Sequence, residues 1–242
     1  MKSVSIGGLR IHNVNMQQAV STCLALIDSR VPAAVYTPNA EIAKNALDDQ
    51  DFLALLNDGD LVVPDGAGVV LASKILGTPL QQKVAGVELA EQLIPRLAES
   101  GARLFLLGGK PGVADLAAKN LLERNPYLNI CGTAHGYFND EHSLVKEIKE
   151  AGTQVLFVCL GSPKQELFIH RNMSTCNALM LGLGGTVDVF AGTAQRAPSF
   201  FVRNHLEWLY RGATDLRRVR RLLKIPAFLF DILCIRLKGE QP

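Results

Sequence analysis

The chain has 242 residues, of which 48% are apolar and 20% charged, and its net charge is +2. These values exclude an intrinsically disordered protein, and the length suits one sizeable α/β domain with or without a small appendage. The charge is uneven, because nine lysines and arginines but only four acidic residues lie from residue 201 onward. A basic C-terminal part on a slightly acidic body indicates an anionic partner for that part.

The cysteines and the apolar runs predict a cytoplasmic protein. There are five cysteines, an odd number without a CxxC pair, which argues against a disulfide framework or a zinc site. The N-terminal residues lack the apolar core of a signal peptide. The longest apolar run, at 225–235, is interrupted by Pro226 and Asp231, and it is too short to span a bilayer.

In the first half of the chain, short apolar strands alternate with segments that have the apolar spacing of helices. Gly7-Gly8 between two short strands is a hairpin signal. The predicted elements are, in order, two strands within 3–11, a helix at 15–29, a strand at 33–37, a helical stretch to about 57, a strand at 61–64, and helices at about 67–76 and 86–99.

The second half repeats this alternation more regularly. Its strands are apolar throughout, which is typical of a parallel sheet covered by helices on both faces. We therefore predict a Rossmann-like α/β core at 1–196. From about residue 197 the chain becomes rich in Arg, Leu and Phe, which predicts a basic, amphipathic helical appendage at 197–242. The strands are expected at 103–107, 128–133, 154–160 and 178–183, and the helices at 112–124, 141–151 and 165–173.

Small and polar residues follow each predicted strand. Because ligands of open α/β sheets bind beyond the carboxyl ends of the strands, these residues predict a ligand cleft at one edge of the sheet. The candidate residues are Thr37, Asn39, Asp65, Gly108, Gly109, His135, Gly136, Gly161, Pro163, Gln165, Gly184, Gly185 and Asp188.

Asp65 is the candidate catalytic residue of this cleft. It lies between Pro64 and Gly66 at a strand end. One interpretation is a turn-forming aspartate. The other is a general base, since a single carboxylate can take the proton of an acceptor hydroxyl as that hydroxyl attacks. A transferase that inverts the sugar needs only one such group.

Two familiar phosphate-binding patterns are absent or misplaced. The run from Gly108 to Gly112 joins a strand to a helix, but it does not match GxGxxG, and no acidic residue follows where a dinucleotide fold holds its ribose. An NAD-dependent dehydrogenase is therefore disfavoured, and it stays an alternative. Asp58-Gly59-Asp60 has the DxD pattern but precedes its strand, which favours a simple turn. We expect no metal site and no cofactor, so cations and helix N-termini would meet a leaving diphosphate.

The C-terminal part supplies such cations. Arg217, Arg220, Arg221 and Lys224 share one helical face by their spacing, and Arg211 precedes them. Apolar residues, including Leu222, Leu223, Phe228 and Phe230, form the other side. This pattern indicates an interfacial helix on an anionic membrane. A solvated basic face over a core-packing stripe is the simpler alternative. Nucleic acid is disfavoured, because no interleaved aromatic and basic surface is visible.

These residues in this order resemble the WecG/TagA/CpsF family of bacterial glycosyltransferases, from about residue 3 to about 225. The motifs that carry the resemblance are TPNAEI at 37–42, VPDGAGVV at 63–70, VAGVEL at 84–89, LLGG at 106–109, HGYF at 135–138, LGSPKQE at 160–166, GLGGTVDVFAG at 182–192, RAP at 196–198 and EWLYR at 207–211.

The resemblance implies a metal-independent, inverting transferase on the cytoplasmic face of the membrane. Such enzymes move N-acetylmannosamine, or its uronic acid, from UDP to undecaprenyl-diphosphate-linked N-acetylglucosamine. It implies Asp65 as the base, Thr37, Asn39 and Gln165 in the pocket, arginines of the C-terminal part at the diphosphate, and a monomer–oligomer equilibrium. The family usually has arginine before VAG, where this chain has Lys83, which keeps the charge but loses the bidentate fork. A non-catalytic sugar-nucleotide sensor with the same cleft is the alternative from another class.

Overall fold

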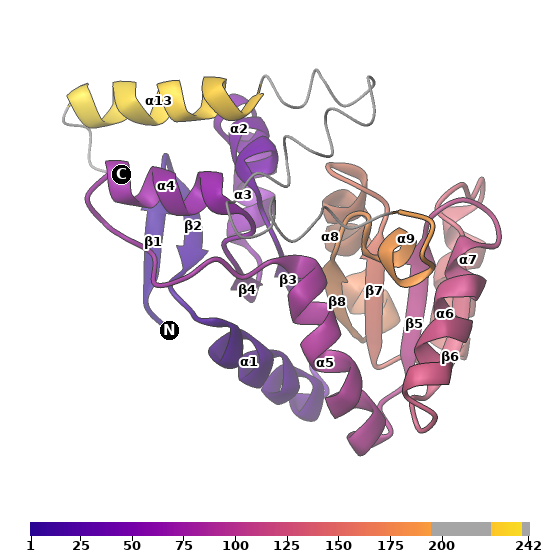
Figure 1. Ribbon diagram of the computed structural model, residues 1–242. Coiled ribbons are helices and arrows are strands. Elements are labelled where there is room, and N and C mark those ends of the chain that lie inside the picture. Colours follow the sequence, from indigo (N-terminus) through magenta and orange to yellow (C-terminus); the bar gives the residue numbers. More distant parts are fainter. Residues whose placement is uncertain (195–223, 239–242) are drawn as a thin grey trace.

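A computed structural model describes residues 1–194 and 224–238. Within them, six parallel strands form a sheet in the order β4-β3-β8-β7-β5-β6 (Figure 1). The parallel α/β core predicted from the sequence is thereby confirmed. The strands of this sheet are β3 (Ala33–Tyr36), β4 (Leu61–Val62), β5 (Leu104–Gly108), β6 (Ile130–Ala134), β7 (Val155–Cys159) and β8 (Leu179–Gly182).

A separate antiparallel hairpin begins the chain, formed by β1 (Ser3–Ile6) and β2 (Leu9–His12). Its turn is made by Gly7 and Gly8, whose φ angles of 59° and 89° lie in the left-handed region that glycine adopts without strain. The sequence predicted this hairpin. Its buried side chains pack under the helices of one face of the main sheet, so the hairpin extends the core.

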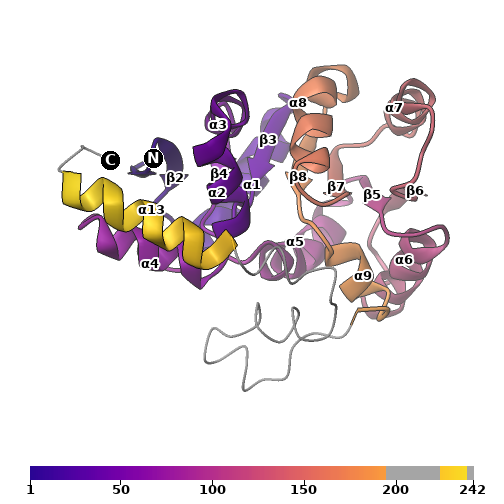
Figure 2. The same cartoon turned by 90° about the horizontal axis from the view of Figure 1, so that it is seen from above.

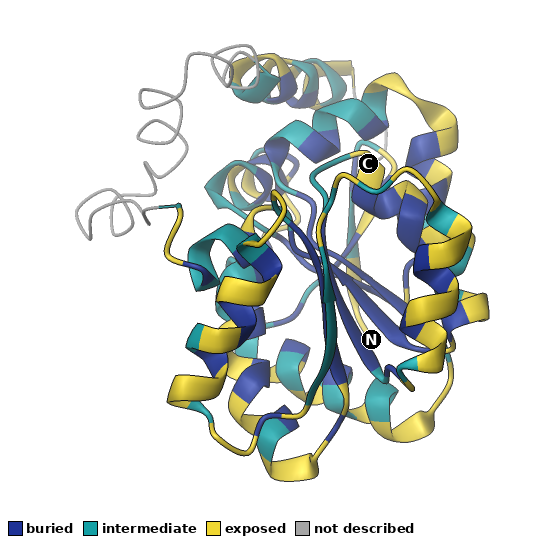
Figure 3. Ribbon diagram, turned by 90° about the vertical axis from the view of Figure 1, so that its right-hand side faces the viewer, coloured by how far each residue is buried: buried dark blue, intermediate teal, exposed yellow. Residues whose placement is uncertain are grey.

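Helices cover both faces of the sheet, which explains why its strands are apolar throughout. Seen along the sheet, α3, α7 and α8 lie on one side and α1, α5, α6 and α9 on the other (Figure 2). The buried strands between these layers are dark blue in Figure 3. The helices are α1 (Met16–Ser29), α2 (Ala40–Asp48), α3 (Gln50–Asn57), α4 (Ala67–Ile75), α5 (Gly86–Ser100), α6 (Val113–Arg124), α7 (Glu141–Glu150), α8 (Lys164–Cys176), α9 (Thr186–Phe190) and α13 (Lys224–Lys238).

Several boundaries differ from the expectation by a few residues, the short helix α9 was not predicted, and two of the differences are described here. The helical stretch predicted up to residue 57 is two helices, because Asp49 ends α2 in an extended conformation and then caps α3 by accepting from the backbone N–H groups of Asp51 and Phe52, both at 3.0 Å. The strand predicted at 61–64 is shorter, with β4 assigned only to Leu61–Val62, although the N–H of Val63 still donates to the carbonyl of Tyr36 at 2.9 Å.

The C-terminal helix α13 packs on α2 and α4 and joins their hydrophobic core (Figure 1). Phe228 and Ile232 are fully buried there, while an ion pair of 3.2 Å joins Asp231 to Lys44 of α2. The assignment of Phe228 to a membrane-facing side is therefore wrong. Phe230, in contrast, is 64% exposed. In the described ranges, no helix combines the length and apolarity needed to cross a bilayer.

Candidate active site

The carboxyl ends of the six strands meet at one edge of the sheet, as the sequence predicted. Around β8 the connections leave on opposite faces: α2 after β3 and α8 after β7 lie on one face, and α9 after β8 lies on the other. Such a reversal opens a crevice between neighbouring strand ends, which is where open α/β sheets bind ligands. The candidate site is therefore centred on the end of β8.

Asp65 lies on the β4 side of this crevice and is tied to the neighbouring loops. Its backbone N–H donates to the carbonyl of Pro38 at 3.1 Å. Its Oδ2 accepts a long hydrogen bond of 3.4 Å from the backbone N–H of Gly86, in the first turn of α5. The N-terminus of α5 thus faces this carboxylate, and the positive end of a helix dipole attracts negative charge. A half-buried carboxylate at a strand end has the chemistry of a general base.

Thr37 connects Asp65 to the centre of the crevice. The hydroxyl of Thr37 is buried and donates to the carbonyl of Gly182, the last residue of β8, at 2.7 Å. A side chain at Gly86 would lie 3.1 Å from the same hydroxyl oxygen, so Gly86 allows β3 and α5 to approach closely. Thr37 therefore fixes the relative positions of the two strand ends.

Asn39 has a structural task that the sequence analysis did not assign to it. Its side-chain oxygen caps α2 by accepting from the backbone N–H groups of Glu41 and Ile42 at 2.9 and 3.1 Å. Lys83, on the loop before α5, forms an ion pair of 3.8 Å with Glu88 in the first turn of that helix. Asn39 Cβ lies 3.8 Å from where a side chain at Gly66 would begin, and the N–H of Val84 donates to the carbonyl of Pro64 at 2.8 Å, so the loops of Asn39 and Lys83 both lie next to the residues that flank Asp65.

Gln165 lies on the opposite side of β8 and is 2% exposed. Its Oε1 accepts from the backbone N–H of Gly184 at 2.8 Å, and its Nε2 donates to Oε1 of Glu166 at 2.9 Å. The β8 end is thus held from both sides, by Thr37 of β3 and by Gln165 of α8. These three elements bring together residues that are far apart in the sequence.

The glycines of the crevice fall into two groups. Gly108 and Gly109 have positive φ angles, and a side chain on either would lie less than 3 Å from neighbouring atoms, so packing alone requires glycine there. At Gly185 the φ angle is −83°, and no atom of the described residues lies within 4 Å of where a side chain would begin. Among the glycines that the structure describes, Gly185 is the one that neither backbone conformation nor packing explains. A ligand that approaches the backbone closely is one physical reason for it.

The loop after β6 lies at the far end of the edge. Gly136 donates its N–H to the carbonyl of Gly109 at 2.9 Å, and the ring Nδ1 of His135 accepts from the N–H of Tyr137 at 3.1 Å. Lys164 of α8 fastens this loop by donating to the carbonyl of Gly136 at 2.7 Å. His135 and Gly136 are therefore close to Gly109 but on the opposite side of β8 from Asp65.

One predicted residue lies beyond the turn after β8, and several others fall outside the described residues. Asp188 is half-buried in α9, beyond the β8 turn. Arg211, Arg217, Arg220 and Arg221 lie outside the residues that the structure describes. Their meeting with the crevice therefore stays a prediction.

The DxD pattern is a turn at the amino end of β4, as predicted. Oδ2 of Asp60 accepts from the backbone N–H of Ala34 at 2.8 Å, and a side chain at Gly59 would collide with the ring of Tyr36 at 2.6 Å. Over residues 1–194 and 224–238, no group of three His, Cys, Asp or Glu side chains has the arrangement of a metal site.

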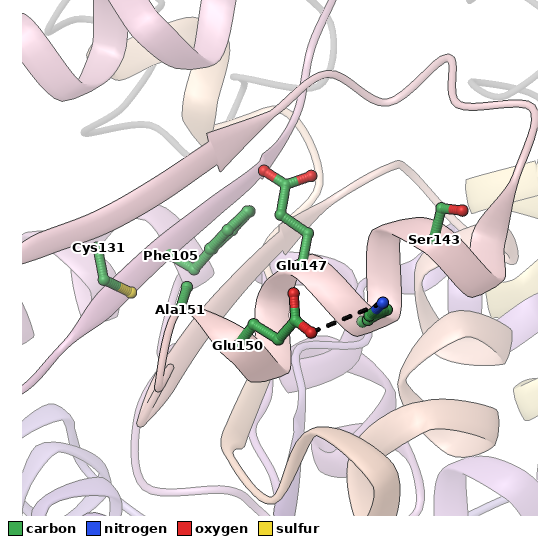
Figure 4. A pocket seen from close by; sticks show the side chains of 7 residues that line it. Phe105, Cys131, Ser143, Glu147, Glu150 and Ala151 are labelled. Carbon is green, nitrogen blue, oxygen red and sulfur yellow. Dashed lines mark ion pairs between the residues drawn. The ribbon is translucent and has the colours of Figure 1, made fainter.

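Two hollows open elsewhere on the described part of the protein. One of about 380 Å³ is lined by residues of β5, β6 and α7, among them Cys131, Phe105 and Glu147 (Figure 4). A larger groove of about 840 Å³ runs between α2, α3 and α8, next to Lys224, and one of the predicted cleft residues, Pro163, lines it. Neither hollow includes Asp65 or the end of β8.

Two further residues lie at this edge, and neither was predicted as a site residue. Glu166 is 1% exposed although it is a charged residue in the first turn of a helix, and its sequence signals are its place directly after Gln165 and at the end of the motif LGSPKQE. Tyr137 is an aromatic residue with 65% exposure in the loop after β6. An exposed aromatic ring near a ligand site can stack on a flat base.

Comparison with known proteins agrees with the motifs. Residues 4–242 match the model of the glycosyl transferase WecG/TagA/CpsF family. Three relatives are named N-acetylglucosaminyldiphosphoundecaprenol N-acetyl-beta-D-mannosaminyltransferase. The relative from Bacillus spizizenii is 37% identical, with 89% of this chain and 84% of the relative covered. That from Bacillus subtilis is 36% identical, with 86% and 81% covered. That from Staphylococcus aureus is 34% identical, with 98% and 95% covered. The chain therefore belongs to the WecG/TagA/CpsF family of glycosyltransferases.

Proposed function

We propose that this glycosyltransferase moves N-acetylmannosamine, or a closely related sugar, from UDP to N-acetylglucosamine carried on undecaprenyl diphosphate. The names of the relatives support this acceptor and this sugar. The observation that carries the proposal is the half-buried carboxylate of Asp65 at a strand end, between the N-terminus of α5 and the Thr37–Gly182 contact. A reaction that inverts the sugar needs one general base at such a position.

In the proposed reaction Asp65 takes the proton of the acceptor hydroxyl while the hydroxyl oxygen attacks the anomeric carbon of the donor. The bond from that carbon to the diphosphate breaks at the same time, and its electron pair leaves with UDP. The configuration at the carbon is inverted because attack and departure occur on opposite faces. The glycine turn at Gly184-Gly185, over which no side chain of the described residues comes within 4 Å of an added Cβ, is the proposed support for the donor.

The leaving UDP carries negative charge that must be stabilised. We propose that cationic side chains do this without a metal. Lys83 is the candidate among the described residues, and its ion pair with Glu88 keeps it next to the α5 terminus. Arg211, Arg217, Arg220 and Arg221 are the further candidates, on the basis of their spacing in the sequence. Changing Arg211 or Arg221 to Ala is expected to reduce transfer even to a short, water-soluble acceptor.

The same proposal places the protein on the inner face of the cell membrane, where a lipid-linked acceptor is found. Its support is the outward face of α13, on which Phe230, Leu233 and Leu237 are exposed by 64%, 46% and 86%. Arg236 and Lys238 lie on the same helix. Exposed apolar side chains next to basic ones suit an anionic bilayer surface.

The test is a screen of UDP-sugars with a synthetic lipid-diphosphate acceptor, in which released UDP is measured. We expect release with UDP-N-acetylmannosamine that depends on the acceptor. UDP-sugar binding without turnover on any acceptor would instead identify a non-catalytic sensor. Hydride transfer to or from NAD would support the dehydrogenase alternative.

A further inference from the structure

Glu166 is a buried carboxyl group that the proposed reaction does not use. It lies in the first turn of α8, next to Gln165, and is 1% exposed. Glutamate is among the residues least often fully buried unless it is paired. No cation pairs with it among the interactions of the described residues. Its burial at the edge of the candidate site therefore needs a reason.

The hydrogen bonds of Glu166 lead toward the crevice. Its Oε1 accepts from Nε2 of Gln165 at 2.9 Å, and Oε1 of Gln165 accepts from the backbone N–H of Gly184 at 2.8 Å. Gly184 begins the turn that also contains Gly185, where no atom of residues 1–194 or 224–238 lies within 4 Å of where a side chain would begin. These hydrogen bonds therefore link the buried Glu166, through Gln165, to the glycine turn.

This arrangement is costly for stability. Oε2 of Glu166 and Oγ of Ser162 are both buried, and within the described residues they are the two buried side-chain polar atoms without a hydrogen-bond partner. Burial raises the pKa of Glu166, the Gln165 amide partly offsets this rise, and the nearby charge of Glu41 raises the pKa further. An apolar residue of similar volume would avoid this cost. A costly group at a ligand site is expected where function requires it.

From these contacts we infer that Glu166 is a positioning residue for donor binding, because it orients the Gln165 amide that holds the Gly184-Gly185 turn. The reason is that carboxylate and amide side chains differ in which of their atoms donate and which accept hydrogen bonds. A carboxylate only accepts, whereas a glutamine amide both donates and accepts. In the structure the NH₂ group of Gln165 points toward Glu166, and its amide oxygen points toward Gly184. A glutamine at 166 would also allow the reversed orientation, in which Gly184 loses its acceptor.

This inference rests on the proposed function, and two variants test it. Glu166→Gln keeps the shape, and Glu166→Met keeps the approximate volume but removes the acceptor. We expect the KM for the UDP-sugar and the Kd for UDP to rise roughly fivefold to tenfold in Glu166→Met, the effect of one lost hydrogen bond, and less in Glu166→Gln. The kcat at saturating donor should change less than about twofold, because the base is untouched. The melting temperature should not fall in Glu166→Gln.

Thr153→Val is the matched control, because Thr153 is also buried and its hydroxyl donates to the carbonyl of Ile148 at 2.6 Å, at the amino end of β7. This control should lower the melting temperature and leave donor KM unchanged. The inference is overturned if the Glu166 variants behave like the control. If Glu166→Met does not fold, Glu166→Gln decides by the same criterion. A wild type that binds UDP but releases none from any UDP-sugar refutes the proposed reaction, while the UDP affinities still decide the role of Glu166. A wild type that does not bind UDP refutes both.

Discussion

The two phenylalanines of α13 lie only two positions apart, yet they should affect different properties of the protein. Phe228 is fully buried against α2 and α4, and Phe230 is 64% exposed on the opposite face. We therefore expect Phe228→Ser to destabilise the fold, and Phe230→Ser to weaken binding to anionic vesicles. The comparison separates packing from membrane contact within one helix.

The magnitudes follow from burial. Truncating a buried phenylalanine costs about 3–5 kcal/mol, a large share of the roughly 5–15 kcal/mol that stabilises a typical domain. Full burial of a phenylalanine side chain is worth about 1.5–3 kcal/mol, and about two thirds of Phe230 is available to the bilayer. Phe230→Ser should therefore weaken vesicle binding by about 1–2 kcal/mol, a factor of roughly 5 to 30.

Denaturant unfolding measures the first effect, and sedimentation with vesicles of anionic and neutral lipid measures the second. Binding of the wild type should also weaken with added salt, because basic residues contribute about 1 kcal/mol each near an anionic surface. Transfer to a short, water-soluble acceptor should remain near wild type in Phe230→Ser. The reasoning is refuted if Phe230→Ser binds vesicles as tightly as wild type, or if Phe228→Ser unfolds at the wild-type denaturant concentration.

Four further predictions concern the site. Asp65→Asn should lower transfer by about 10²- to 10⁴-fold while UDP binding measured by calorimetry persists, and near wild-type turnover would mean that another group is the base. Activity should survive EDTA, because the described residues hold no metal-ligand cluster, and a loss that Mg²⁺ or Mn²⁺ restores would contradict this. Gly185→Ala should keep or raise stability by up to about 1 kcal/mol but raise the donor KM, and an unchanged KM would show that the donor does not approach this backbone. Burial holds the pKa of Glu166 above its usual 4.5, so the folded state binds this proton more tightly than the unfolded state does. The unfolding free energy of wild type should therefore fall relative to that of Glu166→Gln as the pH rises above 4.5. Parallel curves of unfolding free energy against pH would disprove this.

Local sequence signals predicted most of the fold because they depend on neighbouring residues. Gly7-Gly8 indicated the hairpin, and the apolar runs indicated the strands of a sheet covered on both faces. The break at Asp49 was not predicted, since the apolar spacing continues on both sides of it and only the capping geometry ends one helix and begins the next. Which side of α13 faces inward was predicted incorrectly, because apolar residues occupy both sides and the choice depends on contacts with α2 and α4.

The site was predicted as a set of strand ends, and the contacts within it were not. The position of Asp65 follows from its place after a strand. The hydrogen bond between Thr37 and Gly182 joins residues 145 positions apart, which no local pattern reveals. Glu166 was overlooked because charged residues are common in the first turn of a helix, and its burial depends on how α8 packs against β3 and β8.

The docking of α13 also determines when the protein can complete its fold. Side chains near its end reach the beginning of the chain, since Ile235 lies near Gly7 of the first hairpin and Arg236 near Gly77 after α4. A ribosome makes α13 after α2 and α4, so their apolar surfaces stay uncovered until α13 has been made. A stop codon that removes α13 (Lys224–Lys238) would leave that surface exposed to aggregation.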